Sequence, residues 1–207
     1  MLYKAVVFDV DGTLIDTEKA ITQSLIKTVR DMRGIEVGYE RMAEEFGTPS
    51  SHTFAKFGID DLNMENAMSK MSQYFAEHHE QISIFPEIES VLATLTLGDL
   101  HLGIVTSKTR TQFHHEFTPH GLKRYFPVAI CADDTKRHKP YSDPLLKYLE
   151  IADLDPSEVL YIGDSVYDME CAKGAGVDFG LAVWGAVNKQ LPADHVFLRP
   201  YDIVKSI

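Results

Sequence analysis

Two aspartates at the end of an apolar run are the first residues from which chemistry is expected. Asp9 and Asp11 follow apolar residues 5–8 and precede Gly12, within Ala-Val-Val-Phe-Asp-Val-Asp-Gly-Thr. A short apolar run that stops at a turn signal is typical of a buried strand in a parallel sheet. Two carboxylates at the end of such a strand repel each other. A hard divalent cation bound by oxygen atoms is the simplest way to offset that repulsion.

Two other interpretations of the Asp-x-Asp-Gly sequence must be considered. An EF-hand calcium loop needs Gly at its sixth position and Glu at its twelfth. Counted from Asp9, the glycine is fourth and the twelfth residue is Ala20, so the EF-hand pattern does not fit. The second alternative is a solvated turn that carries two acids by chance. Its weight depends on whether other strands of the chain also end in functional groups.

Further strands are predicted over residues 101–105, 128–131 and 159–162. Polar side chains follow them at the strand end or in the next loop: Thr106 and Ser107, Lys139, and Asp164 with Asp168. Open parallel sheets place their ligand sites at the carboxyl ends of the strands, so we expect these groups to lie near the first two aspartates. Carboxylates, a hydroxyl and an ammonium together suit a phosphoryl group and a magnesium ion.

Residues 16–83 are predicted to form an all-helical insertion. Ile21, Leu25, Val29 and Met32 recur at helical spacing before Gly34, which is a stop signal. Shorter helices are predicted over 39–46 and from a cap at Ser50 or Ser51 to Gly58, and a longer one over 64–80.

The remaining residues, 1–15 and 84–207, are predicted to form one α/β core domain. Helices are expected over residues 87–97, 110–118, 143–151 and 166–175, with two further strands near 179–183 and 195–198. Strands that alternate with helices in this way predict a doubly wound parallel sheet, Rossmann-like in its layers.

Composition excludes several classes of partner. The 207 residues carry a formal net charge of −11, which argues against a nucleic-acid partner because such binding depends on clustered Lys and Arg. Cys131 and Cys171 form no Cys-x-x-Cys pair, so free thiols in a reducing compartment are expected. Without a signal peptide or an apolar run of membrane-spanning length, we expect a cytoplasmic protein with no membrane partner. We expect it to be a monomer or a weak dimer.

The four polar motifs, in this order, resemble those of the haloacid dehalogenase superfamily. They are Asp-x-Asp-Gly-Thr, a strand ending in Thr, Lys-Pro, and Gly-Asp-Ser-x-x-Asp. The helical insertion resembles the small cap of the phosphoglycolate phosphatase and β-phosphoglucomutase branch, as do Ala175-Gly176 and Trp184-Gly185. The resemblance covers nearly the whole chain and implies a Rossmann-like core with an inserted helical cap domain.

The resemblance also implies roles for individual residues. Asp9 would be the nucleophile that becomes an aspartyl-phosphate, and Asp11 the general acid and then the base. The family's Mg²⁺ ligands fall on Asp9, the backbone carbonyl of Asp11, and Asp164, with Asp168 supporting the metal from the second shell. The transferred phosphoryl would be bound by Thr106, Ser107 and Lys139. The family's frequent Lys-Pro-x-Pro-x-Pro is Lys139-Pro-Tyr-Ser-Asp-Pro144 here, and Ser107 replaces a frequent Asn.

We therefore expect a magnesium-dependent phosphatase for a small phosphorylated metabolite, with phosphoglycolate favoured and pyrophosphate as a variant. A phosphomutase and a regulatory binding module on the same scaffold are the alternatives. Substrate selection is expected from a cap loop that includes Thr48, Ser50, Ser51 and His52. Residues 48–52 contain no Arg or Lys, whereas the mutases of this branch carry an arginine there for a second phosphate.

Overall fold

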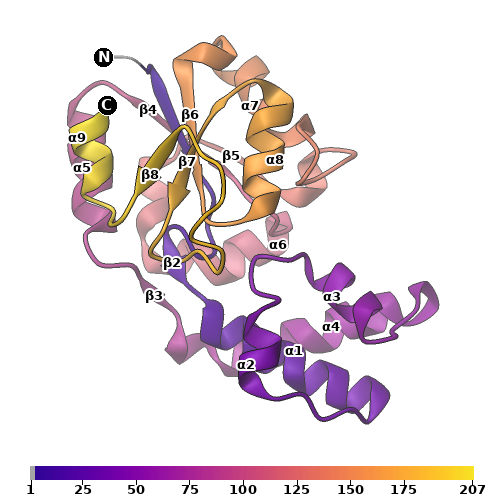
Figure 1. The fold of residues 1–207 in the computed structure, drawn as a ribbon. Helices are drawn as coiled ribbons and strands as arrows, with labels where there is room; N and C mark the ends of the chain where they lie inside the picture. The colour runs from indigo at the N-terminus through magenta and orange to yellow at the C-terminus, as the bar shows by residue number, and fades with distance from the viewer. Residues whose placement is uncertain (1–2) are drawn as a thin grey trace. The chain divides into compact units, whose positions relative to one another are not determined.

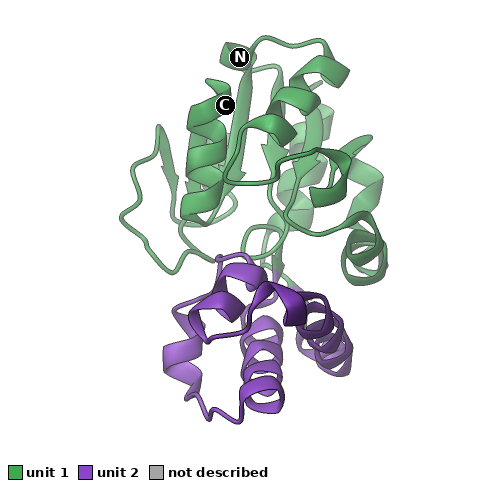
Figure 2. Ribbon diagram, turned by 90° about the vertical axis from the view of Figure 1, so that its right-hand side faces the viewer, with its two compact units in different colours: residues 1–15, 84–207 green, residues 16–83 purple. Residues whose placement is uncertain are grey.

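A computed structural model describes residues 3–207, which divide into two compact units. The first holds the chain up to Ile15 together with Ile84–Ile207, and the second holds Asp16–Ser83 (Figure 2). None of the described helices has the length and apolar character needed to cross a membrane.

The first unit is built on a parallel six-stranded sheet in the order β5-β4-β1-β6-β7-β8. The strands are β1 (Ala5–Phe8), β4 (His101–Val105), β5 (Val128–Ile130), β6 (Val159–Gly163), β7 (Asp178–Ala182) and β8 (His195–Phe197). The doubly wound α/β fold predicted from the alternation of strands and helices is confirmed.

Helices lie to either side of this sheet, with α5 packed on α9 and α7 packed on α8 (Figure 1). The α-helices of the unit are α5 (Ile88–Leu97), α6 (Arg110–Gln112), α7 (Asp143–Ala152), α8 (Val166–Ala175) and α9 (Asp202–Ser206). The predicted helix over 110–118 differs from the structure. After one turn of α6 the chain continues as the π-helix η2 (Phe113–Phe117) and then as the 3₁₀ turn η3 (Thr118–His120). Further 3₁₀ turns are η4 (Leu122–Tyr125), η5 (Ala132–Asp134) and η6 (Pro156–Glu158).

Strand β1 lies between β4 and β6, and this position explains its sequence. All four of its residues are fully buried, because neighbouring strands and both helical layers cover it. Phe8 stands opposite Ile104 of β4 and Ile162 of β6. The residues that follow these three strands therefore emerge at one edge of the sheet.

The second unit contains α1 (Glu18–Arg33), α2 (Tyr39–Ala43), α3 (Ser50–Lys56), α4 (Asp61–Glu77) and the turn η1 (His79–Gln81). Two-residue strands β2 (Ile15–Asp16) and β3 (Ser83–Ile84) pair where the chain passes between the units. The core of the second unit is formed by buried residues of all four α-helices and of the loop between α3 and α4: Leu25, Val29, Met42, Phe54, Ile59 and Ala67.

Two helix starts in this unit differ from prediction. Neither Ser50 nor Ser51 caps α3, because the helix already begins at Ser50 and the carbonyl of Pro49 accepts from the N–H groups of His52 and Thr53. Helix α4 begins at Asp61 rather than residue 64. The Asp60 carboxylate accepts from the backbone N–H of Asn63 at 3.1 Å and thereby caps the helix.

Candidate active site

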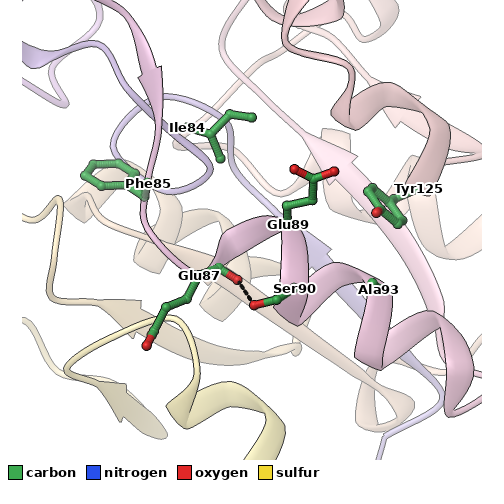
Figure 3. Close-up of a pocket in the computed structure, with 7 residues that line it drawn as sticks. All are labelled: Ile84, Phe85, Glu87, Glu89, Ser90, Ala93 and Tyr125. Atoms are coloured by element: carbon green, nitrogen blue, oxygen red, sulfur yellow. Dashed lines mark hydrogen bonds between the residues drawn. The ribbon is translucent and has the colours of Figure 1, made fainter.

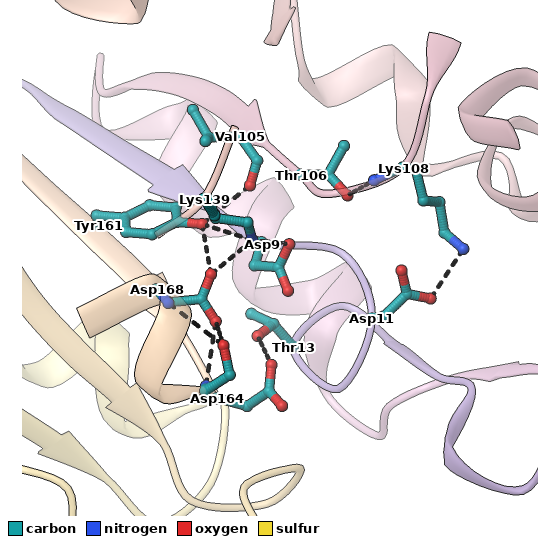
Figure 4. Close-up of polar contacts among 11 residues, drawn as sticks. Asp9, Asp11, Thr13, Val105, Thr106, Lys108, Lys139, Tyr161, Asp164 and Asp168 are labelled. Atoms are coloured by element: carbon teal, nitrogen blue, oxygen red, sulfur yellow. Dashed lines mark hydrogen bonds and ion pairs between the residues drawn. The ribbon is translucent and has the colours of Figure 1, made fainter. Parts of the chain in front are cut away.

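Three predicted aspartates and one predicted lysine meet at the carboxyl edge of the sheet (Figure 4). Asp9, Asp164 and Asp168 each place a carboxylate oxygen within 4.8 Å of the other two, and all three residues are buried. Asp9 is fixed at the end of β1, where its backbone N–H donates to Ile162 O of β6 at 2.9 Å. This convergence follows from the parallel register described above.

Lys139 joins the nucleophile candidate to Asp168. Its Nζ lies 2.8 Å from Asp9 Oδ1, 2.6 Å from Asp168 Oδ1 and 3.1 Å from Tyr161 Oη. Burial alone would lower the pKa of Lys139, but the carboxylates of Asp168 and Asp9 raise it above its ordinary value. The ammonium therefore stays charged, and its three N–H groups contact Asp9, Asp168 and Tyr161, which fixes it beside the Asp9 carboxylate.

Asp168 is held from both sides of its carboxylate. Besides Lys139 and Tyr161 at Oδ1, Ser165 donates to Oδ2 from its backbone N–H at 3.1 Å and from Oγ at 2.5 Å. The Ser165 hydroxyl in return caps α8 by accepting from the backbone N–H of Asp168. Four donor groups from three residues fill the acceptor positions of this carboxylate, so Asp168 is suited to supporting a site rather than to binding a cation directly.

Two glycines allow the backbone to approach these aspartates. Gly12 has φ 77°, and a Cβ there would lie 2.5 Å from Asp164 Oδ2. A Cβ on Gly163 would lie 2.5 Å from Cβ of Asp168. Thr13, just after Gly12, donates to Asp164 Oδ1 at 3.1 Å. The turn after β1 is thus packed directly against the Asp164 carboxylate.

The aspartate cluster is unbalanced in charge. Burial raises the pKa of Asp9 to about 7, as do the charges of Asp168 and Asp11, although Lys139 opposes the shift. Burial, Asp168 and Asp9 also raise the pKa of Asp164. Such shifts mean that the ionised carboxylates lack sufficient compensation within the chain. Clustered carboxylate oxygens with excess negative charge are the donor set that fits a hard divalent cation.

Lys108 also lies at this edge of the sheet, although it was not predicted from the sequence. Lys108 is only 6% exposed, and its Nζ lies 3.0 Å from Asp11 Oδ1 and 2.6 Å from Glu116 Oε2. Burial would lower the pKa of Lys108, but the two carboxylates raise it above its ordinary value. The available signal was a lysine two residues after Thr106 in the turn that follows a buried strand.

The two hydroxyl residues of this turn differ in their surroundings. Thr106 is buried, and its Oγ1 accepts from the backbone N–H of Lys108 at 3.2 Å. That bond uses the Thr106 hydroxyl as an acceptor and leaves its own proton available for donation. Ser107 has an exposed side chain. The geometry therefore supports Thr106 more strongly than Ser107 as a phosphate-binding residue, although both remain predictions.

Thr48, Ser50, Ser51 and His52 lie in the second unit, in the turn before α3 and in its first helical residues. The two cations that flank this loop contact the buried carboxylate of Glu45. Arg41 Nη1 lies 3.0 Å from Glu45 Oε1, and Lys56 Nζ lies 2.6 Å from Oε2. Glu44 also pairs with Arg41 at 3.1 Å. The charges of these four side chains balance.

A separate groove of about 570 Å³ lies beside α5, lined by Ile84, Phe85, Glu87, Glu89, Ser90, Ala93 and Tyr125 (Figure 3). Its charged lining residues are two glutamates, of which Glu89 pairs with Arg124. Carboxylates at the lining repel an anion, so this groove is poorly suited to a phosphorylated ligand. The aspartate cluster is the better candidate.

Residues 6–182 match the family model described as haloacid dehalogenase-like hydrolase. The chain belongs to this family. A candidate pyrophosphatase PpaX from Caldanaerobacter subterraneus subsp. tengcongensis is 34% identical, covering 92% of this chain and 86% of that protein. A phosphoglycolate phosphatase from Aquifex aeolicus is 30% identical over 98% of this chain and 95% of its own length. Among solved structures, a candidate phosphoglycolate phosphatase from Lactobacillus plantarum is 34% identical in sequence. Its crystal structure matches this one with a TM-score of 0.92 over 99% of both chains.

These findings confirm three predictions. The family predicted from the four motifs is correct, and so is the Rossmann-like core of the fold. The enzyme class, a phosphatase of this family, is also confirmed.

Proposed function

We propose that this chain is a magnesium-dependent phosphatase that hydrolyses a small phosphorylated metabolite through a phosphorylated Asp9. The observation that carries the proposal is the placement of Asp9. Its carboxylate lies at the carboxyl end of the central strand, 2.8 Å from the Lys139 ammonium and close to two further buried aspartates. A carboxylate so positioned is a usable nucleophile toward phosphorus, and its acyl phosphate is readily hydrolysed.

The reaction takes two balanced steps. A carboxylate oxygen of Asp9 forms a bond to phosphorus while the bond to the leaving oxygen breaks, and Asp11 gives its proton to that oxygen. Asp11 then accepts a proton from water as the water oxygen attacks phosphorus, which releases inorganic phosphate and restores Asp9. The Thr106 hydroxyl, the Ser107 hydroxyl and the Lys139 ammonium are assigned to the phosphoryl oxygens.

Asp9, Asp164 and the backbone carbonyl of Asp11 are assigned as the residues that hold Mg²⁺, with Asp168 as their support. When bound, the ion supplies charge neutralisation for the phosphoryl oxygens and the clustered acids. The donor set supports this assignment, because the five carboxyl groups at this edge are accompanied by two lysines, Lys108 and Lys139. The carboxyl groups are those of Asp9, Asp11, Glu116, Asp164 and Asp168.

The second unit bears on the choice between a phosphatase and a phosphomutase. A mutase must bind a second phosphate, and that requires cations in the inserted unit. Loop residues 48–52 contain no Arg or Lys, and the flanking Arg41 and Lys56 both contact Glu45. These contacts favour hydrolysis over isomerisation.

For the substrate we propose phosphoglycolate or a compound of similar size, selected by Thr48, Ser50, Ser51 and His52. Pyrophosphate is the second candidate, since a 34% identical relative is named for that activity.

A phosphate-release assay with Mg²⁺ over several dozen phosphorylated compounds, phosphoglycolate and pyrophosphate included, tests the proposal. The control is Asp9→Asn, which cannot form the phosphorylated intermediate. Release no faster than in the control for every compound would refute the phosphatase proposal. A second assay incubates the protein with β-glucose 1-phosphate and a bisphosphate primer and follows the products by ³¹P NMR. Formation of glucose 6-phosphate faster than any phosphate release would instead establish a mutase.

A further inference from the structure

The two aspartates of the first motif each contact a different buried lysine. Lys139 contacts Asp9, and Lys108 contacts Asp11 through Oδ1 at 3.0 Å (Figure 4). Lys139 lies in the loop before α7, whereas Lys108 lies in the loop after β4. Each carboxylate therefore has its own cation, and each cation is anchored by a second carboxylate, Glu116 or Asp168.

The Lys108 contact does not resemble an ordinary surface ion pair. Both Lys108 and the Glu116 side chain are largely buried, with side-chain exposures of 7% and 12%. The Lys108 backbone is also fixed, because its N–H donates to Thr106 Oγ1. Glu116 lies on the π-helix η2, next to Phe117, which is fully buried. Lys108 is thus held at its backbone by Thr106 and at its ammonium by Glu116, so the ammonium reaches Asp11 from a fixed direction.

We propose that Lys108, held by Glu116, is a positioning residue that orients the Asp11 carboxylate for proton transfer to the leaving group. This inference rests on the proposed function, in which Asp11 is the acid. Because Lys108 donates to Oδ1, the proton of the acid form belongs on Oδ2. The lysine thereby selects which oxygen faces the reaction and restricts rotation of the carboxyl group. An error of about 1 Å in such an orientation can cost ~10²-fold in rate.

The test compares two phosphate esters that differ in their need for an acid. An alkyl phosphate releases a strongly basic alkoxide and needs a proton, whereas 4-nitrophenyl phosphate releases a weakly basic phenolate and needs little help. The measured quantity is kcat/KM, which reports the steps up to phosphoryl transfer to Asp9. We expect Lys108→Met to lower kcat/KM for the alkyl ester by ~10²-fold and for the aryl ester by less than about tenfold.

Three further variants make the comparison specific. Glu116→Gln removes the anchor and should lower kcat/KM for the alkyl ester by about tenfold, with a smaller effect on the aryl ester. This variant also tests the proposal if Lys108→Met fails to fold. Lys139→Met, which disturbs the nucleophile, should slow both esters equally. The exposed Lys136→Met should change neither ester.

A double-mutant cycle separates positioning from a general structural role. With Asp11→Asn already present, Lys108→Met should lose its selective effect on the alkyl ester, because there is no acid left to orient. An equal loss on both esters in folded Lys108→Met and Glu116→Gln, or no loss in either, would overturn the inference while the phosphatase proposal stands. A wild-type protein that cleaves neither ester nor any compound of the screen would refute the proposed function itself.

Discussion

The carboxyl edge of the sheet and the Glu45 cluster of the second unit both place buried carboxylates beside cations, but their charge balances differ. Around Glu45, the acids Glu44 and Glu45 meet the bases Arg41 and Lys56, so the cluster is neutral. At the sheet edge, five carboxyl groups meet two lysines.

The pKa values respond to this difference. Burial would raise the pKa of Glu45, but the hydrogen bonds from Lys56 and Arg41 outweigh burial and lower it. At the sheet edge burial prevails, and the pKa values of Asp9 and Asp164 rise despite Lys139. A neutral cluster is complete as a structural element, whereas an acidic one is stabilised by an added cation. The Glu45 cluster therefore needs no further ion, whereas the excess negative charge at the sheet edge is what the proposed metal ion would offset.

The largest effect is expected from Asp9→Asn, which tests whether the acidic edge is catalytic. The amide has nearly the same shape but cannot attack phosphorus. Loss of a nucleophile in a concerted site costs ~10⁴ to 10⁶ in kcat. The measurement is phosphate release under saturating substrate, with circular dichroism as the control for folding. More than a tenth of the wild-type rate in a folded variant would show that Asp9 is not the nucleophile.

Removal of the metal tests the charge deficit directly. EDTA should abolish activity reversibly, and Mg²⁺ should raise the melting temperature of the wild-type protein, since a ligand that binds only the folded state stabilises it. Asp164→Ala should weaken Mg²⁺ activation by at least ~10–100-fold, because that is the loss typical for a residue that only supports a metal ligand. The Mg²⁺-dependent rise in melting temperature should shrink with it. Undiminished activity in EDTA would contradict the metal proposal.

Tyr161→Phe tests how far Lys139 depends on its surroundings. The variant removes the hydroxyl that lies 3.1 Å from Lys139 Nζ and 2.8 Å from Asp168 Oδ1. A buried polar group left without a partner costs about 1–3 kcal/mol. We expect a lower melting temperature and a roughly tenfold lower kcat. A loss of stability with an unchanged kcat would show that Tyr161 serves the fold alone.

Glu45→Gln should have the smallest effect on turnover. The free energy of unfolding should fall by about 1 kcal/mol, a value reduced because Arg41 and Lys56 are half exposed and can be hydrated. Cleavage of 4-nitrophenyl phosphate should stay within about twofold of the wild type. A strong activation of mutase chemistry would instead show that Glu45 masks a second phosphate site.

The pH dependence of stability offers a second readout for Glu45. Its folded-state pKa lies below its ordinary value of 4.5, so its ionised form favours the folded protein. This stabilisation is fully present above about pH 4.5 and is lost as the pH falls through the lower, folded-state pKa. The difference in unfolding free energy between wild type and Glu45→Gln should therefore be largest near neutral pH and shrink in acid. A constant difference would argue that packing, not charge, is responsible.

Local sequence was sufficient wherever a residue's role depends on its place along a strand or helix. The apolar run before Asp9, the strand over 101–105 and the helix over 166–175 appear as predicted. Aspartates placed after such strands could be assigned to one edge, because parallel strands bring their carboxyl ends together. The sequence by itself therefore determined the fold class, the family and the aspartate and lysine motifs.

The tertiary structure decided how those groups are paired. Lys108 and Glu116 are eight residues apart, and no local pattern indicates that the lysine would fold inward to Asp11. The contact of Tyr161 with Lys139, and of Lys56 with Glu45, likewise depends on elements brought together only in the folded chain. Strand and helix periodicity fixes which face a residue occupies. The partner of a charged side chain depends instead on distance, burial and the competition among nearby charges, which exist only once the chain has folded.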